Sequence, residues 1–199
     1  MTRTSIGMLR KRPVKAGAAS VAFGFVALAV SGAAAGAQTK ELSDTSVRSL
    51  MNYAWTLMPG PKVTTQDGKE ILIDDSKRDE IMIPVDAARD VIKVGRLSAN
   101  AQTCGLPEEQ SANHATLMKR ERDRNKWSPA QIIYINQLHL FTVMLMTGGV
   151  KLIEKEGNGG KEVVLENTKI APPKADACND AERKKVLEQI TAYREAKSN

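Results

Sequence analysis

The segment from Trp127 to Gly148 constrains the fold most, because it is a long apolar stretch that has to be buried. Ser128, Pro129 and Gln131 give a strong helix start: a capping residue, a proline at the first helical position, and a glutamine three residues after the cap. The paired glycines that begin at Gly148 are a typical helix end. The sequence therefore predicts one well-bounded helix over this segment.

Apolar residues in this segment cover nearly the whole circumference of the helix. A helix that is apolar on all sides lies inside a bundle or crosses a membrane. This one is short for a membrane span, and four polar residues interrupt it, namely Gln131, Asn136, Gln137 and His139. The pattern predicts a mainly α protein: a small bundle of about five helices around the central buried helix 127–148, with one or two short β-hairpins.

The N-terminus has the pattern of an export signal. Residues 1–17 contain five basic residues and no acidic one, and residues 18–35 form an uncharged apolar run. Ala35-Gly36-Ala37 fits the small-x-small rule for cleavage, which makes Gln38 the first mature residue. We expect residues 1–37 to be removed on export to the periplasm or beyond, the alternative being an uncleaved anchor. Residues 38–199 then form a single mainly helical domain.

Removal of the signal changes the charge of the protein. The whole chain has 29 basic and 23 acidic residues, a net charge of +6. Without the five basic residues of the signal, 24 basic residues face 23 acidic ones, a net charge of +1. A chain so close to neutral gives no reason to expect a nucleic-acid partner. We also expect no stable membrane span after cleavage.

Cys104 and Cys178 are the two cysteines of the chain. In an oxidising compartment, two cysteines and no others favour one structural disulfide. The alternatives are two buried thiols or an exposed redox pair. The two cysteines do not form a C-x-x-C motif, which thioredoxin-like chemistry and haem attachment require.

Further helices are predicted at 43–58, at 84–104, from Pro107 into the charged run 119–126, and from about Asn179 onward. Turn residues predict hairpins at 62–74 and 150–166, and the two are candidates for pairing into one small sheet. Small residues around Gly95 predict that helix 84–104 packs closely on the central helix.

Several charged segments are predicted to lie on the surface. The acidic residues between Asp74 and Glu80 are typical of a solvated linker. Asp86 and Asp90 alternate with Arg89 and Lys93, so an ion-paired surface is expected instead of an acid–base dyad. Acidic residues interrupt the basic run 119–126, which favours a solvated or partner-facing helix surface.

The histidines are the remaining candidates for chemistry. His139 lies midway along the central helix, three residues after Asn136, and His114 is the second histidine. No H-E-x-x-H, G-x-S-x-G or dinucleotide motif is present, so neither a metal nor a cofactor is predicted. We interpret Asn136 and His139 as a polar core that fixes helix register, and keep a functional site built on them as the alternative.

Three functions of different classes remain open. The favoured one is an exported, non-enzymatic helical module that binds a protein, a component of the cell envelope or a small apolar ligand. The second is an enzyme or metal-dependent protein that uses His139 with a carboxylate. The third is a structural envelope protein without a ligand.

Overall fold

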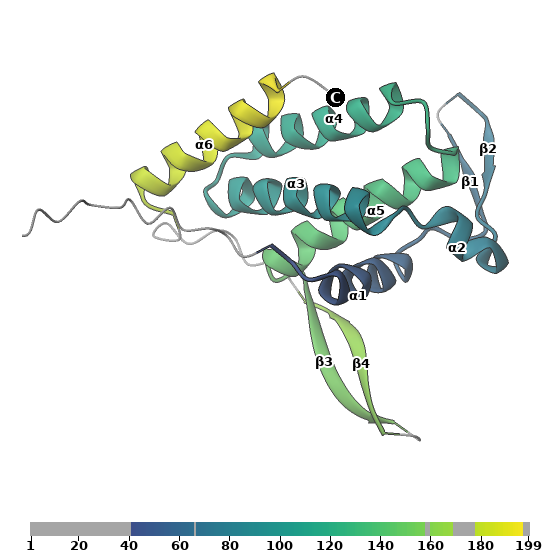
Figure 1. The fold of residues 1–199 in the computed structure, drawn as a ribbon. Coiled ribbons are helices and arrows are strands. Elements are labelled where there is room, and N and C mark those ends of the chain that lie inside the picture. The colour runs from purple at the N-terminus through teal and green to yellow at the C-terminus, as the bar shows by residue number, and fades with distance from the viewer. Residues whose placement is uncertain (1–40, 66, 158–159, 169–177, 197–199) are drawn as a thin grey trace, which may run out of the picture. The chain divides into compact units, whose positions relative to one another are not determined.

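Figure 1 shows a computed structural model of the chain, which describes residues 41–65, 67–157, 160–168 and 178–196. The predicted export signal, 1–37, lies outside the described residues. Residue contacts separate residues 1–39 from residues 40–199, and every element named below belongs to the second unit. These elements are α1 (Asp44–Trp55), β1 (Lys62–Thr64), β2 (Glu70–Leu72), a 3-10 turn η1 (Asp75–Lys77), α2 (Arg78–Ile81), α3 (Val85–Thr103), α4 (Pro107–Asp123), α5 (Pro129–Met146), β3 (Val150–Gly157), β4 (Gly160–Asn167) and α6 (Asp180–Glu195).

The predicted fold class is confirmed, since the described chain is a helical bundle with two hairpins. The predicted central helix α5 contacts α1, α2, α3 and α4, but α3 is equally central, because it contacts α1, α4, α5 and α6 (Figure 1). The main core gathers buried apolar side chains from α1, α3, α4 and α5. Within the described part of the chain, no helix combines the length and the apolar character needed to cross a bilayer.

Both ends of α5 follow from the sequence signals. Ser128 and Gln131 form a reciprocal capping box, which satisfies two backbone N–H groups that would otherwise lack partners. At the other end, Gly148 adopts a φ of +77°, and the N–H of Gly149 donates to the carbonyl of Met144 at 2.7 Å. This is a Schellman-type end, in which glycine takes the left-handed position without a Cβ penalty.

Gly95 is the point of closest approach between α3 and α5. A Cβ atom placed on Gly95 would lie 2.8 Å from Cβ of Thr142 and 3.3 Å from the carbonyl oxygen of His139. The two helix backbones can approach this closely only because Gly95 has no side chain. The close packing predicted from the small residues of this helix is therefore present.

The first hairpin pairs β1 with β2, and the second pairs β3 with β4. They form two separate two-stranded sheets, so the prediction that they join into one sheet is wrong. In the first hairpin, the N–H of Thr65 donates to the carbonyl of Lys69 at 2.9 Å and closes the turn. Of the helices, α5 is the one that contacts each hairpin, and it lies between them.

A second, smaller core fixes α6. Val186 and Ile190 of α6 pack with Ala101, Cys104 and Leu106 at the end of α3 and the turn that follows it. Cys104 lies at disulfide distance from Cys178, with a Cα–Cα distance of 4.9 Å. The predicted pairing thus attaches the start of α6 to the end of α3.

Two charged segments differ in part from the predictions, although the acidic residues between Asp74 and Glu80 are exposed as expected. The acidic linker folds into η1 and α2, and the side chain of Asp74 caps the turn by accepting from the N–H of Ser76 at 3.0 Å. In the run 119–126, Glu121 is only 6% exposed. Arg120 of the same run stacks on the ring of Tyr193 in α6, 4.4 Å from its centroid. The run is therefore partly a helix–helix contact.

Candidate functional site

The predicted polar core lies where α3, α4 and α5 meet. His139 is 2% exposed, and its Nε2 lies 2.9 Å from Oγ of Ser98. The amide of Asn113 in α4 donates to the same Oγ at 2.9 Å and to the carbonyl of Val94 at 3.1 Å. Because Ser98 accepts from Asn113, its own proton can donate to Nε2, which leaves the proton of the neutral imidazole on Nδ1.

Asn136 has a different partner from His139. Its Oδ1 accepts from Nε2 of His114 in α4 at 2.8 Å. The rings of His114 and His139 lie against each other with centroids 4.7 Å apart, so His114 is the link between the two predicted residues. The cluster joins α5 to α3 through His139 and to α4 through Asn136.

This environment limits what His139 can do chemically. Burial, reinforced by the nearby His114, lowers the pKa of His139 to about 3, so the ring is neutral at physiological pH. Its Nδ1 and Oδ1 of Asn113 have no hydrogen-bond partner within the described residues. Across the same residues, His, Cys, Asp and Glu side chains form no group of three that could hold a metal ion. The cluster thus has the properties of a helix-joining core.

Sequence analysis missed Ser98 and Asn113 because each is a single small polar residue on an otherwise ordinary helix. A weak signal was present. Ser98 shares the face of Gly95 and Val94 at helical spacing, and Asn113 shares the face of Leu117. A polar residue on a face that must be buried indicates a partner in a facing helix.

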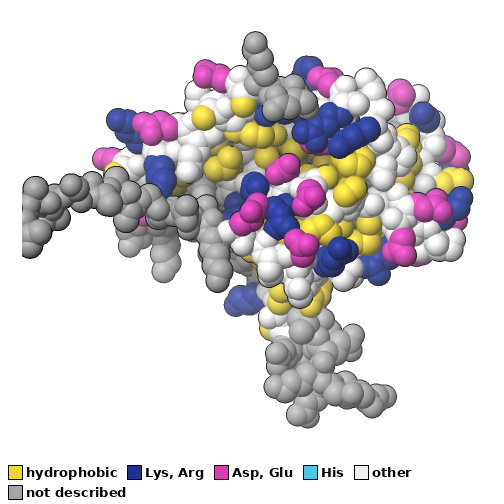
Figure 2. All heavy atoms as spheres, viewed as in Figure 1, with side chains coloured by type: hydrophobic (Ala, Val, Ile, Leu, Met, Phe, Trp, Pro, Cys, Tyr) yellow, Lys and Arg dark blue, Asp and Glu magenta, His cyan; other side chains and the backbone are white. Residues whose placement is uncertain are grey.

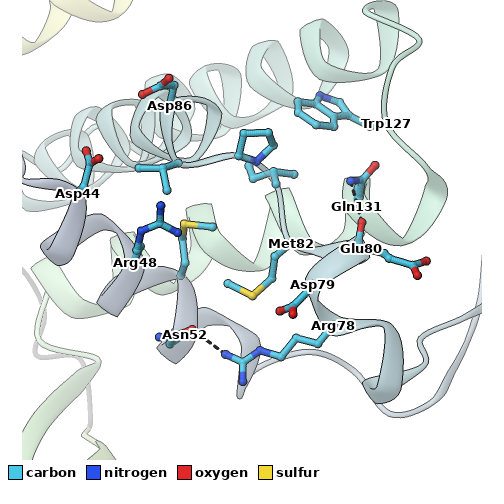
Figure 3. A pocket seen from close by; sticks show the side chains of 14 residues that line it. Asp44, Arg48, Asn52, Arg78, Asp79, Glu80, Met82, Asp86, Trp127 and Gln131 are labelled. Carbon is cyan, nitrogen blue, oxygen red and sulfur yellow. Dashed lines mark hydrogen bonds between the residues drawn. The ribbon is translucent and has the colours of Figure 1, made fainter.

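A groove of about 1130 Å³ lies between α1, α2, the start of α3 and the start of α5. Figure 3 shows Asp44 and Asp86 at one end and Trp127 and Gln131 at the other, with Met82 between them. Sequence analysis did not find this groove, because its lining comes from four segments that meet only in the folded chain.

The floor of the groove is apolar and its frame is rigid. Buried Met51 and Ile83 and half-buried Met82 line it. The hydroxyl of the buried Tyr134 in α5 donates to the carbonyl of Met51 at 2.9 Å, which fixes α1 against α5. The amide of Gln131 donates to the carbonyl of Glu80 at 3.0 Å, which fixes α2 against the same helix.

Trp127 is held at its end of the groove by a buried carboxylate. Its indole N–H donates to Glu121 at 2.6 Å. Arg124 also pairs with Glu121, at 3.2 Å, so the buried charge is compensated. The half-buried indole therefore presents a fixed aromatic surface to the groove.

The charges of the groove differ from the ion-paired surface predicted for α3. Lys93 pairs with Asp90 at 3.5 Å as expected, but Arg89, only 13% exposed, pairs with Asp44 and Glu41 instead of Asp86. The reason is that the segment leading into α1 crosses α3 here and brings its own carboxylates. Asp86 consequently has no ion pair within the described residues.

A smaller hollow of about 540 Å³ continues the groove past Asp44 and Asp86. It contains the ion pairs of Arg89 and Lys93, and hydrogen bonding to Glu41 raises the pKa of Lys93. Figure 2 shows acidic and basic side chains together over α1 and α3, with apolar surface exposed between them. Polar and apolar surface are therefore mixed around the groove.

Comparison with known proteins gives no relative from which a function can be transferred. No protein-family model, no curated protein and no solved structure matches the chain.

Proposed function

We propose that this protein is an exported, non-enzymatic binding module whose groove accommodates an extended segment of a partner protein. The groove carries the proposal: about 1130 Å³ of open space with an apolar floor and a polar rim, on a frame fixed by hydrogen bonds between helices. A volume slightly above the range of about 300–1,000 Å³ for small-molecule sites suits an elongated ligand.

The composition of the floor supports a protein segment as the ligand. Half-buried Met82 has a flexible, polarizable side chain that adapts to apolar groups of different shapes. Trp127 adds a rigid aromatic surface, and tryptophan is enriched where proteins bind one another. Together these residues can hold apolar side chains of a peptide.

Export is supported by the N-terminal sequence and by the cysteine pair. Basic residues, an apolar run and a small-x-small site follow one another in residues 1–37. A disulfide between Cys104 and Cys178 would persist in an oxidising compartment. The partner is therefore proposed to be a protein of the cell envelope or the exterior.

The alternative of an enzyme based on His139 has less support. Its imidazole faces Ser98 and His114 inside the bundle and does not line the groove. A purely structural envelope protein would give no reason for a groove with an apolar floor and with charges that lack ion pairs within the described residues.

The proposal is tested by NMR titration of residues 38–199 with a pool of short random-sequence peptides. We expect amide shifts around Met82 and Asp86, and a shift of the Trp127 indole signal. Met82→Lys places a charge on the floor and should abolish these shifts, whereas Met146→Lys, at a position 44% exposed on α5 and outside the groove, should not. Shifts that are absent, or that survive Met82→Lys, would refute the proposal.

A further inference from the structure

The charges that line the groove are unequal. Four carboxylates and two guanidinium groups face it: Asp44, Asp79, Glu80, Asp86, Arg48 and Arg78. Asp44 is neutralised by Arg89, and Arg78 donates to the side-chain oxygen of Asn52 at 2.7 Å while its guanidinium lies 5.4 Å from the centroid of the Trp55 ring.

With Asp44 paired, three carboxylates face two guanidinium groups, because the contacts of Arg78 with a neutral amide and an aromatic ring leave its charge in place. Asp79, Glu80 and Asp86 are exposed and have no ion pair within the described residues, and the same holds for Arg48. The rim of the groove thus has an excess of one negative charge, and its three carboxylates have no ion pair within the described residues. Such an excess attracts cationic ligands and repels anionic ones.

The acidic side chains also lie on both sides of the apolar floor. Asp86 lies at the end where α3 starts, and Asp79 and Glu80 lie along α2 (Figure 3). Met82 lies between these two positions in the chain and on the floor. A ligand that crosses the floor therefore meets a carboxylate before and after its apolar contact.

We infer that the groove binds a cationic peptide segment, in which an apolar centre packs on Met82 and is flanked on both sides by lysine or arginine. This inference rests on the proposed function and specifies its ligand class. The flanking cations pair with Asp86 at one end and with Asp79 and Glu80 along α2. Arg48 and Arg78, which lie on the α1 side, disfavour a further cation there.

Three synthetic peptides test the inference. All have a Leu-Val-Leu centre and blocked ends, and their flanks are two lysines, two glutamines or two glutamates on each side. Binding is followed through the indole N–H signal of Trp127, which is assigned with a Trp55→Phe variant. The lysine peptide should bind most tightly, and its affinity should fall as salt is raised.

A second experiment removes two of the carboxylates that line the groove. The double variant Asp79→Asn with Asp86→Asn should weaken the lysine peptide about tenfold and leave the glutamine peptide unchanged. Asp180→Asn is the matched control, because it removes a carboxylate from the first turn of α6 and does not line the groove. It should leave all three affinities unchanged.

The outcomes distinguish failure of the inferred ligand class from failure of the proposed peptide-binding site. If the glutamine or glutamate peptide binds at Trp127 as tightly as the lysine peptide, the inferred preference for cationic peptides is refuted. The proposal that the groove binds peptides is then kept. If the double variant binds the lysine peptide like the unmodified protein, the cationic ligand is also wrong. If no peptide shifts the Trp127 signal, both the cationic ligand and the peptide groove fail.

Discussion

Replacing His139 with glutamine should remove a large part of the acid sensitivity of the fold. In an unfolded chain histidine titrates near pH 6.5, whereas burial and then the neighbouring His114 lower the pKa of folded His139 to about 3. Between these two values the unfolded state binds a proton that the native state does not. The contribution of neutral, buried His139 to the free energy of unfolding is therefore fully present above pH 6.5. It is lost progressively as the pH falls toward 3.

The magnitude follows from the separation of the two pKa values. Within this window each pH unit lowers the free energy of unfolding by about 1.4 kcal/mol. Between pH 7.5 and pH 4.5 the loss amounts to about 2.7 kcal/mol, and a folded pKa one unit higher barely changes it, because pH 4.5 still lies above it. Glutamine does not titrate and can still bond Ser98 through its terminal amide, so His139→Gln should lack this loss.

The assay is urea unfolding of the unmodified protein and of His139→Gln at several pH values between 7.5 and 4.5. Carboxylates titrate in both proteins, so the difference between the two curves isolates His139. The Hε1 NMR signal of His139 should also stay constant over this range. A stability difference that does not change with pH would refute the reasoning, since it would mean that His139 titrates alike in the folded and unfolded states.

Three further changes test other parts of the structure. Reduction of the Cys104–Cys178 pair, which spans 74 residues, should lower the free energy of unfolding by about 4–5 kcal/mol, and two labelled thiols in unreduced exported protein would contradict the pairing. Gly95→Ala should cost about 1–2 kcal/mol in urea unfolding, because the clash with Thr142 outweighs the better helix propensity of alanine; a stabilised variant would contradict the close packing. Intact mass spectrometry of the exported protein should show a chain that starts at Gln38, and the mass of the full chain would contradict cleavage.

Local signals predicted the helices well. The capping box of Ser128 and Gln131 and the glycine end at Gly148 lie within a few residues of the helix ends that they define. The same holds for Asn179, which caps α6 as the sequence predicts. Such motifs satisfy backbone groups locally, so they can be found before the tertiary fold is known.

Contacts between distant segments could not be predicted in the same way. Arg89 was expected to pair within its own helix, but it pairs with Glu41, which precedes α1, and with Asp44, the first residue of α1. The four residues of α2 are too few to show a helical period, so this segment was predicted to be a linker. The groove depends on both of these features, and for that reason the sequence did not indicate it.

For the candidate polar core, the sequence identified the residues of one helix and missed their partners. Asn136 and His139 stood out because they interrupt an apolar helix. The identity of their partners, His114 and Ser98, depends on how α3 and α4 pack against α5. Helix–helix register of this kind is set by side-chain packing over the whole interface and leaves no signature in one helix alone.

The peptide groove is tested most directly by locating the lysine peptide on the protein with a nitroxide label at the peptide's N-terminus. Paramagnetic broadening of amide signals reports which residues come close to the label. We expect broadening confined to the groove, strongest between Asp79 and Asp86 and next to Trp127, with the signals of α6 unaffected. Broadening centred on α6 or on the β3–β4 hairpin, or spread evenly over the protein, would contradict a binding site in the groove.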